Sequence, residues 1–245
     1  MTFPLPIEFH FLTDVLSIFI AYRYYLYLKS KTGDFLPEDT RFVTIVGAAT
    51  GALIGSRLLA FIEHFETASQ LSWMYIFSSK TIVGGVIGGI IGVEIAKKFL
   101  KIKTATGDLL TFPLILGIII GRIGCFFTGV FDGTVGNVTT MPWGMNLGDG
   151  LIRHPTSLYE IIFLVIMFYV LKKISKGVPM KPGLLFRLFV ASYLVFRFCI
   201  EYIKPITPLF IGLSAIQLAS LVFALYYIYS IVFVYGYRPF NVKEV

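Results

Sequence analysis

The chain has 245 residues and a formal net charge of +7, and 56% of its residues are hydrophobic, with a mean hydropathy of +0.81. A water-soluble domain of this length cannot bury so much apolar surface, so the composition excludes an ordinary soluble enzyme and indicates a protein dissolved in a bilayer. The positive charge does not indicate nucleic-acid binding, because the basic residues fall in short loops between apolar segments.

Seven apolar stretches are long enough to cross the hydrocarbon core as helices, which takes about 20 residues. The fifth is short, so we expect its helix to begin inside the preceding loop. The sequence therefore predicts an all-α integral membrane protein, with residues 1–245 forming a single polytopic domain. The predicted transmembrane helices cover residues 9–28, 42–62, 81–99, 109–129, 157–171, 184–203 and 209–234.

Basic residues predict the orientation of these helices. Most lysines and arginines lie in the loops after the first, third and fifth helices and in the C-terminal tail, whereas the other side holds Lys80, Arg153 and Lys204. Because cytoplasmic loops are enriched in lysine and arginine, the N-terminus is predicted outside and the C-terminus in the cytoplasm. Residues 130–156, rich in glycine and turn-forming residues, are predicted to form a small extracytoplasmic cap between the fourth and fifth helices.

Glycines recur at every fourth position in three of the predicted helices. This spacing places small residues on one helix face and allows two backbones to approach closely. Packing is the interpretation we favour; the alternative is that Gly84 and Gly85, at the outer start of the third helix, leave room for a ligand. The spaced sets are Gly47, Gly51 and Gly55, then Gly84, Gly88 and Gly92, then Gly117 and Gly121.

Several charged residues lie inside predicted helices. Arg57, Arg122 and Arg197 occupy the outer halves of three helices, and Glu201 follows Arg197 by four residues, on the same helix face. A charge near the bilayer centre costs on the order of 3 kcal/mol, so such residues usually face a polar cavity or a partner. We expect Glu201 and Glu160, one turn into the fifth helix, to pair with two of the arginines.

The same outer layer holds Lys80, Arg153 and His154, which precede the third and fifth helices. Guanidinium groups bind phosphate in a bidentate fork, so this layer predicts a site for the head group of an anionic phospholipid. The alternative is a set of structural ion pairs and of side chains that extend to the interface. Cys125 and Cys199 lie in apolar segments and are predicted to be buried packing residues.

Several distinct short motifs follow one another along the chain between about residue 10 and residue 217. They include VGGVIGG at residues 83–89, GRIG at 121–124 with Gly129 and Gly133, RHPTSLYE at 153–160 and YLVFRFCIE at 193–201. Together these motifs resemble those of the bacterial prolipoprotein diacylglyceryl transferase family. The resemblance implies seven membrane helices with an outside N-terminus, in agreement with the charge pattern, and a location in the bacterial inner membrane.

By this resemblance, the chain transfers the diacylglyceryl group of phosphatidylglycerol to the thiol of a lipobox cysteine in a prolipoprotein, and glycerol phosphate leaves. The leaving phosphate needs cationic stabilisation. The expected partners are phosphatidylglycerol or another anionic phospholipid and a lipobox segment, and no cofactor, metal or nucleic acid is expected. The implied catalytic residues are Arg122, Arg197 and Glu201, with His154 as a substitute base. The implied substrate-binding residues are Arg57, Lys80, Gly84, Gly85, Gly133, Arg153, Tyr159 and Glu160.

Three positions depart from the family pattern. Val83 stands where the family motif has histidine, Cys125 where it has asparagine, and Val130 where it has glutamate. That histidine is a plausible base for the acceptor thiol, so the departures affect the half of the site that handles the acceptor. The identity of the acceptor is therefore left open. The alternative to a transferase is a non-catalytic phospholipid-binding protein of the same fold. A small lipid transporter is disfavoured, because paired interrupted helices are not evident.

Overall fold

The structure is a computed structural model that describes residues 4–65, 79–177, 180–205 and 208–235. The chain divides into two compact units. The first comprises Met1–Gly33, Thr106–Phe189 and Tyr202–Pro205. The second comprises Asp34–Ala105, Val190–Glu201 and Ile206–Val245. The basic tail used above to predict orientation, residues 236–245, lies outside the described residues.

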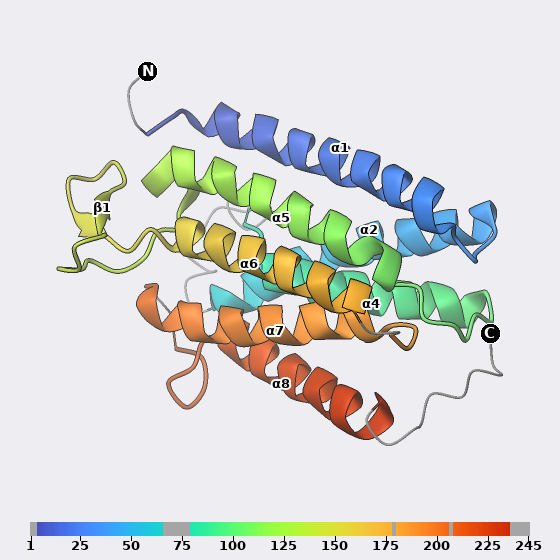
Figure 1. The fold of residues 1–245 in the computed structure, drawn as a ribbon. Coiled ribbons are helices and arrows are strands. Elements are labelled where there is room, and N and C mark those ends of the chain that lie inside the picture. Colours follow the sequence, from blue (N-terminus) through green and yellow to red (C-terminus); the bar gives the residue numbers. More distant parts are fainter. Residues whose placement is uncertain (1–3, 66–78, 178–179, 206–207, 236–245) are drawn as a thin grey trace. The chain divides into compact units, whose positions relative to one another are not determined.

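Three long helices form most of the first unit. Helix α1 (Ile7–Thr32) packs along α5 (Asp108–Thr128), and α5 also packs against α6 (Thr156–Gly177), as Figure 1 shows. Gly124 permits the close approach of α1, because a Cβ atom at this position would lie 1.9 Å from Oγ1 of Thr13. The first and fourth predicted helices are therefore neighbours held at short range.

The predicted cap segment has its own short elements. The 3₁₀ helix η2 (Gly129–Asp132) continues from α5, and strands β1 (Met145–Asn146) and β2 (Ile152–Arg153) pair antiparallel. Gly133 ends η2 in the left-handed conformation, with φ of +69°, which a residue with a side chain rarely adopts. These elements interrupt an otherwise helical unit.

The second unit is built on α2 (Glu38–Glu63) and α4 (Ile82–Phe99), which pack against each other, with α8 (Ala215–Tyr229) and the π-helical turn η4 (Ser230–Tyr235). The glycines of α2 and α4 face each other: a Cβ atom on Gly88 would lie 2.2 Å from the carbonyl oxygen of Gly51. One on Gly84 would lie 2.3 Å from that of Gly55, so the space beside Gly84 is filled by α2 and does not hold a ligand. The packing interpretation is confirmed for the glycines of α2 and α4, but not for Gly117 and Gly121, where a Cβ atom would have its nearest neighbour at 3.4 Å and 4.0 Å.

Helix α7 (Leu184–Ile200) is divided between the units, with residues 184–189 in the first and 190–200 in the second, and the 3₁₀ helix η3 (Glu201–Ile203) follows it. Asp108 anchors the start of α7 within the first unit. Its Oδ2 accepts a hydrogen bond from the Gly183 amide at 2.5 Å, and its Oδ1 accepts one from the Phe186 amide at 2.9 Å. The carboxylate thereby satisfies amides that the first turn of a helix leaves without partners.

Each of the seven predicted ranges contains an α-helix, but two boundaries were wrong. Helix α6 begins at Thr156, the last residue of the predicted cap, but it extends to Gly177, beyond the predicted end at residue 171. Helix α8 begins at Ala215 and not at residue 209, because Ser214 forms a capping box with Gln217. Before this cap, Gly212 has a φ of +76°, which turns the chain out of a helical path.

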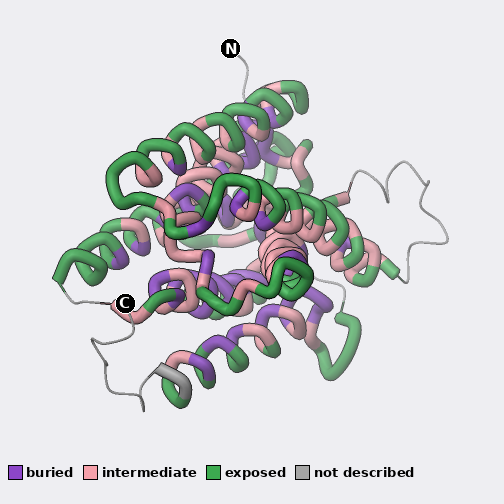
Figure 2. Tube along the Cα trace, turned by 90° about the vertical axis from the view of Figure 1, so that its right-hand side faces the viewer, coloured by how far each residue is buried: buried purple, intermediate pink, exposed green. Residues whose placement is uncertain are grey.

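Three helical runs in the described residues are long and apolar enough to cross a membrane: Glu38–Glu63, Asp108–Asp132 and Ala215–Phe233. Exposed positions recur along the helices of both units in Figure 2, and many of them are large apolar residues. Phe11 on α1 is 71% exposed and Leu53 on α2 is 65% exposed. Apolar surface of this extent is unfavourable in water, and it suits contact with lipid.

The glycine contacts between α2 and α4 predict a stability difference between two alanine variants. Gly88→Ala should destabilise the protein by about 1–3 kcal/mol, because the new methyl group meets a backbone carbonyl that has to move. Gly85→Ala is the matched control, since its Cβ atom would have its nearest neighbour at 3.8 Å. Thermal unfolding in detergent measures both variants, and equal midpoints would contradict this account of the interface.

Candidate functional site

The predicted site residues occur in both units of the chain. Arg197 and Glu201 lie in the second unit together with part of the predicted binding set, and Arg122 and Glu160 lie in the first. In the first unit the remaining members are Gly133, Arg153, His154 and Tyr159. In the second they are Arg57, Lys80, Gly84 and Gly85.

A buried ion pair joins α5 to α6 in the first unit. Nε of Arg122 lies 2.9 Å from Oε2 of Glu160, and the two side chains are 5% and 2% exposed. In such surroundings each charge depends on the other, because removing one partner leaves an uncompensated buried charge. The predicted pairing of Glu160 with an arginine is confirmed.

Cys125 extends this polar region by one turn of α5. Nη1 of Arg122 donates to its sulfur at 3.4 Å, and Sγ lies 3.3 Å from Nε2 of His10 on α1. The Cys125 thiol is buried, as predicted, but its neighbours are polar groups, so the expectation of a packing residue was incomplete; the predicted burial of Cys199 was wrong, because that thiol is exposed. The contact across the two helices is possible because Gly124 lets α1 approach α5.

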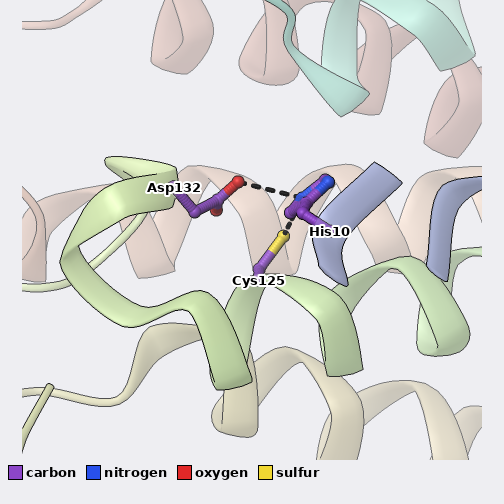
Figure 3. Close-up of side chains that lie close together, drawn as sticks. All are labelled: His10, Cys125 and Asp132. Atoms are coloured by element: carbon purple, nitrogen blue, oxygen red, sulfur yellow. Dashed lines mark hydrogen bonds and ion pairs between the residues drawn. The ribbon is translucent and has the colours of Figure 1, made fainter. Parts of the chain in front are cut away.

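His10 is held by carboxylates on both ring nitrogens. Nε2 lies 2.9 Å from Oδ1 of Asp132, and Nδ1 lies 3.2 Å from Oδ2 of Asp14, one turn along α1. Asp132 also accepts a hydrogen bond from the hydroxyl of Thr134. Figure 3 shows His10, Cys125 and Asp132 pointing toward one another from α1, α5 and η2, and we call these three residues the His10 cluster.

The His10 cluster has a composition suited to a metal ion. Its ligand atoms, one nitrogen, one sulfur and one carboxylate oxygen, all lie within 4.8 Å of one another. Sequence reasoning missed the cluster because its members are distant in the chain, with His10 and Cys125 separated by 115 positions. A signal was present, since a histidine and an aspartate four residues apart share one face of the N-terminal half of α1.

The outer residues of the first unit are closer to solvent. Nδ1 of His154 lies 3.1 Å from the hydroxyl of Tyr159, and Nε of Arg153 lies 2.6 Å from Oδ2 of Asp149. The hydrogen bond from Arg153 lowers the pKa of Asp149 below its ordinary value. A Cβ atom at Gly133 would meet nothing within 4 Å, so this turn has open space beside it.

The second unit contains a second buried pair. Nη2 of Arg197 donates to Oε2 of Glu201 at 3.0 Å, and the two side chains are 4% and 6% exposed. The pair lies where α7 passes into η3, and it confirms the predicted role of Glu201 as the partner of an arginine. Arg122 and Arg197 are thus each balanced by one glutamate within their own unit.

The start of α4 brings together the other predicted residues of this unit. Nη1 of Arg57 donates to the backbone carbonyl of Ser79 at 3.0 Å, beside the exposed Lys80. Oγ1 of Thr81 accepts the amide of Gly84 at 3.2 Å, so this amide serves as part of the helix cap. Val83, where the family motif has histidine, is completely buried.

The buried pair in the first unit predicts a non-additive stability effect. Glu160→Gln should destabilise the protein by about 3–5 kcal/mol, because it leaves the Arg122 charge buried without its carboxylate. The double variant Arg122→Gln/Glu160→Gln should lose less free energy of unfolding than the two single variants lose in sum. Asp149→Asn, which breaks a more exposed pair, is the control with a small effect. Additive losses in thermal unfolding would contradict the coupling.

Comparison with known proteins confirms the family resemblance. The sequence model of the family described as prolipoprotein diacylglyceryl transferase matches residues 1–233 of the chain. The phosphatidylglycerol–prolipoprotein diacylglyceryl transferase of Wolbachia sp. subsp. Brugia malayi is 29% identical over 214 residues, which cover 82% of this chain and 79% of that protein. The protein of the same name from Wolbachia pipientis wMel is 29% identical over 233 residues, covering 89% of this chain and 87% of its own length. One from Bordetella bronchiseptica is 30% identical over 187 residues, covering 74% and 70%. This chain belongs to the prolipoprotein diacylglyceryl transferase family.

Proposed function

We propose that the chain transfers the diacylglyceryl group of phosphatidylglycerol to the lipobox cysteine of a prolipoprotein. The observation that carries this proposal is the buried Arg122–Glu160 pair, which keeps a guanidinium group charged inside an apolar helix. Family membership and the names of the relatives, which specify phosphatidylglycerol and a prolipoprotein, support the choice of donor and acceptor.

The chemistry of the transfer requires a fixed cation. A thiolate displaces a phosphate ester at carbon, and negative charge grows on the departing phosphate, so donors already aimed at that phosphate lower the barrier. A guanidinium group has five N–H donors in a planar fork, which allows it to hold a carboxylate and a phosphate oxygen together. We assign Arg122 to the phosphate and Glu160 to the orientation of Arg122.

The second unit has an equivalent pair, and we propose the same division of roles for Arg197 and Glu201. Other cations proposed to attract the anionic head group are Arg57, Lys80 and Arg153. Gly85, Gly133 and Tyr159 are proposed to contact the donor. His154, hydrogen-bonded to Tyr159, is the candidate base that the sequence suggests for the acceptor thiol.

The same proposal covers the arrangement in the membrane. We propose seven transmembrane helices in the bacterial inner membrane, with the N-terminus outside and residues 130–156 forming an extracytoplasmic cap. Support comes from the distribution of basic residues in the loops and from the apolar side chains exposed along the helices. In this arrangement the donor lipid reaches the site sideways from the outer leaflet.

Direct turnover tests the proposed function. Purified protein in detergent is incubated with phosphatidylglycerol and a lipobox peptide, and mass spectrometry should detect a peptide heavier by one diacylglyceryl group. A peptide with serine in place of the lipobox cysteine is the control and should remain unmodified. Retention of phosphatidylglycerol without any modified peptide would instead support a non-catalytic phospholipid-binding protein.

The phosphate role of Arg122 predicts a large rate effect from a conservative change. Arg122→Lys keeps the positive charge but removes the planar fork, and it should lower the transfer rate by a factor on the order of 10²–10³. Arg23→Lys, at an exposed position of α1, is the matched control and should keep the original rate. An Arg122→Lys variant with an unchanged rate would remove Arg122 from the catalytic residues.

A further inference from the structure

We propose that His10, Cys125 and Asp132 bind a zinc ion, and that the acceptor thiol occupies the fourth coordination position. This inference rests on the proposed function for the identity of the thiol, but the metal site itself stands on the geometry of the His10 cluster. The three side chains come from α1, α5 and η2 within one unit of the chain.

The distances in the cluster are close to those that zinc requires. Nε2 of His10 lies 2.9 Å from Oδ1 of Asp132 and 3.3 Å from Sγ of Cys125. Ligand atoms in a tetrahedral zinc site are about 3.4–3.6 Å apart, as zinc–nitrogen and zinc–sulfur bond lengths dictate. The two distances from Nε2 therefore need to lengthen by about half an ångström, and all three ligand atoms already lie within 4.8 Å of one another, so side-chain rotations can bring them to the ion.

The surroundings of His10 match the outer shell of a metal-bound histidine. A histidine that binds metal through one nitrogen usually donates its other N–H group to a carboxylate, which fixes the orientation of the ring. Here Nδ1 lies 3.2 Å from Asp14, while Nε2 faces Cys125 and Asp132 (Figure 3). Asp132 is itself held by the hydroxyl of Thr134, so two of the three ligands have supporting hydrogen bonds.

The types of ligand favour zinc over magnesium or calcium. Thiolate and imidazole are ligands of zinc and of softer metals, whereas magnesium and calcium prefer oxygen. The charges also suit a divalent ion, because Asp132 and a thiolate at Cys125 together supply two negative charges. Arg122 donates to the same sulfur, but its positive charge is neutralised by Glu160. It therefore adds little electrostatic repulsion toward the metal ion.

A zinc ion with three protein ligands keeps one position open, and this position offers a way to activate the acceptor thiol. The family motif has a histidine at position 83, but this chain has a buried valine there. Coordination deprotonates a thiol, and its proton passes to water. The resulting sulfur attacks the glycerol carbon of phosphatidylglycerol, a carbon–sulfur bond forms, and the carbon–oxygen bond to phosphate breaks. Its electron pair leaves with glycerol phosphate, which Arg122 stabilises, so the step needs no other reactant.

Metal binding to the full chain tests the site without any substrate. Protein in detergent is stripped with EDTA, dialysed and titrated with Zn²⁺ by calorimetry, and one ion per chain should bind. Titration with Co²⁺ should produce the near-ultraviolet charge-transfer band of a cobalt–thiolate bond together with the visible bands of tetrahedral cobalt. Because this measurement uses the unmodified sequence, it does not depend on whether a variant folds, and a spectrum without the thiolate band would overturn the proposal.

Variants then assign the ligands. Cys125→Ser, His10→Gln and Asp132→Asn should each abolish stoichiometric binding, and Asp14→Asn should weaken it by about 10–100-fold, as loss of an outer-shell partner does. Cys199→Ser is the matched cysteine control, since this thiol is exposed, and it should bind metal like the original chain. Zinc binding that survives in Cys125→Ser but is lost in Cys199→Ser would overturn the assignment.

The transfer assay separates the metal site from the proposed function. If the chain binds zinc through the His10 cluster and also transfers the diacylglyceryl group, EDTA treatment should abolish transfer and Zn²⁺ should restore it. Undiminished transfer after stripping would overturn the role in thiol activation and would favour His154 as the base. Stoichiometric zinc binding without transfer to the lipobox peptide would leave the metal site supported and contradict the proposed function alone.

Discussion

A buried charge in an apolar helix needs an opposite charge beside it, and the Arg122–Glu160 pair meets this requirement in the first unit. The pair fixes α5 relative to α6 and holds a guanidinium group away from water. Because Glu160 neutralises the arginine, the neighbouring Cys125 sulfur lies beside a donor without lying in an excess of positive charge. The polar contacts of this unit depend on that compensation, because burying an arginine without an opposite charge costs free energy.

Small residues decide which polar side chains can meet. Gly124 brings α1 near enough to α5 for His10 to contact Cys125, and the facing glycines of α2 and α4 bring those two backbones into contact. Helices that associate in a membrane rely on such close packing, because lipid tails are as apolar as the side chains that face them. Close glycine contacts therefore have separate consequences in the two units, a helix interface in one and, through Gly124, a polar cluster in the other.

Much of the fold could be predicted from local sequence, because a span of about 20 apolar residues and a four-residue glycine repeat are both local patterns. The pairing of Glu160 with an arginine could also be predicted, since two opposite charges in apolar helices have few other partners. The start of α8 was misplaced because apolar residues precede the Ser214 cap, and hydropathy does not register a turn at Gly212. The His10 cluster was missed because it depends on a contact between distant segments, which no local pattern contains.

The proposed function requires the buried, charge-balanced guanidinium group of Arg122 to bind the phosphate of an anionic lipid. Native mass spectrometry of the protein released from mixed phosphatidylglycerol and phosphatidylcholine micelles measures this binding most directly. We expect the original chain to retain phosphatidylglycerol in preference to phosphatidylcholine, and the double variant Arg122→Gln/Glu160→Gln to lose this preference. Equal retention of the two lipids by the original chain, or an unchanged preference in the double variant, would contradict the claim.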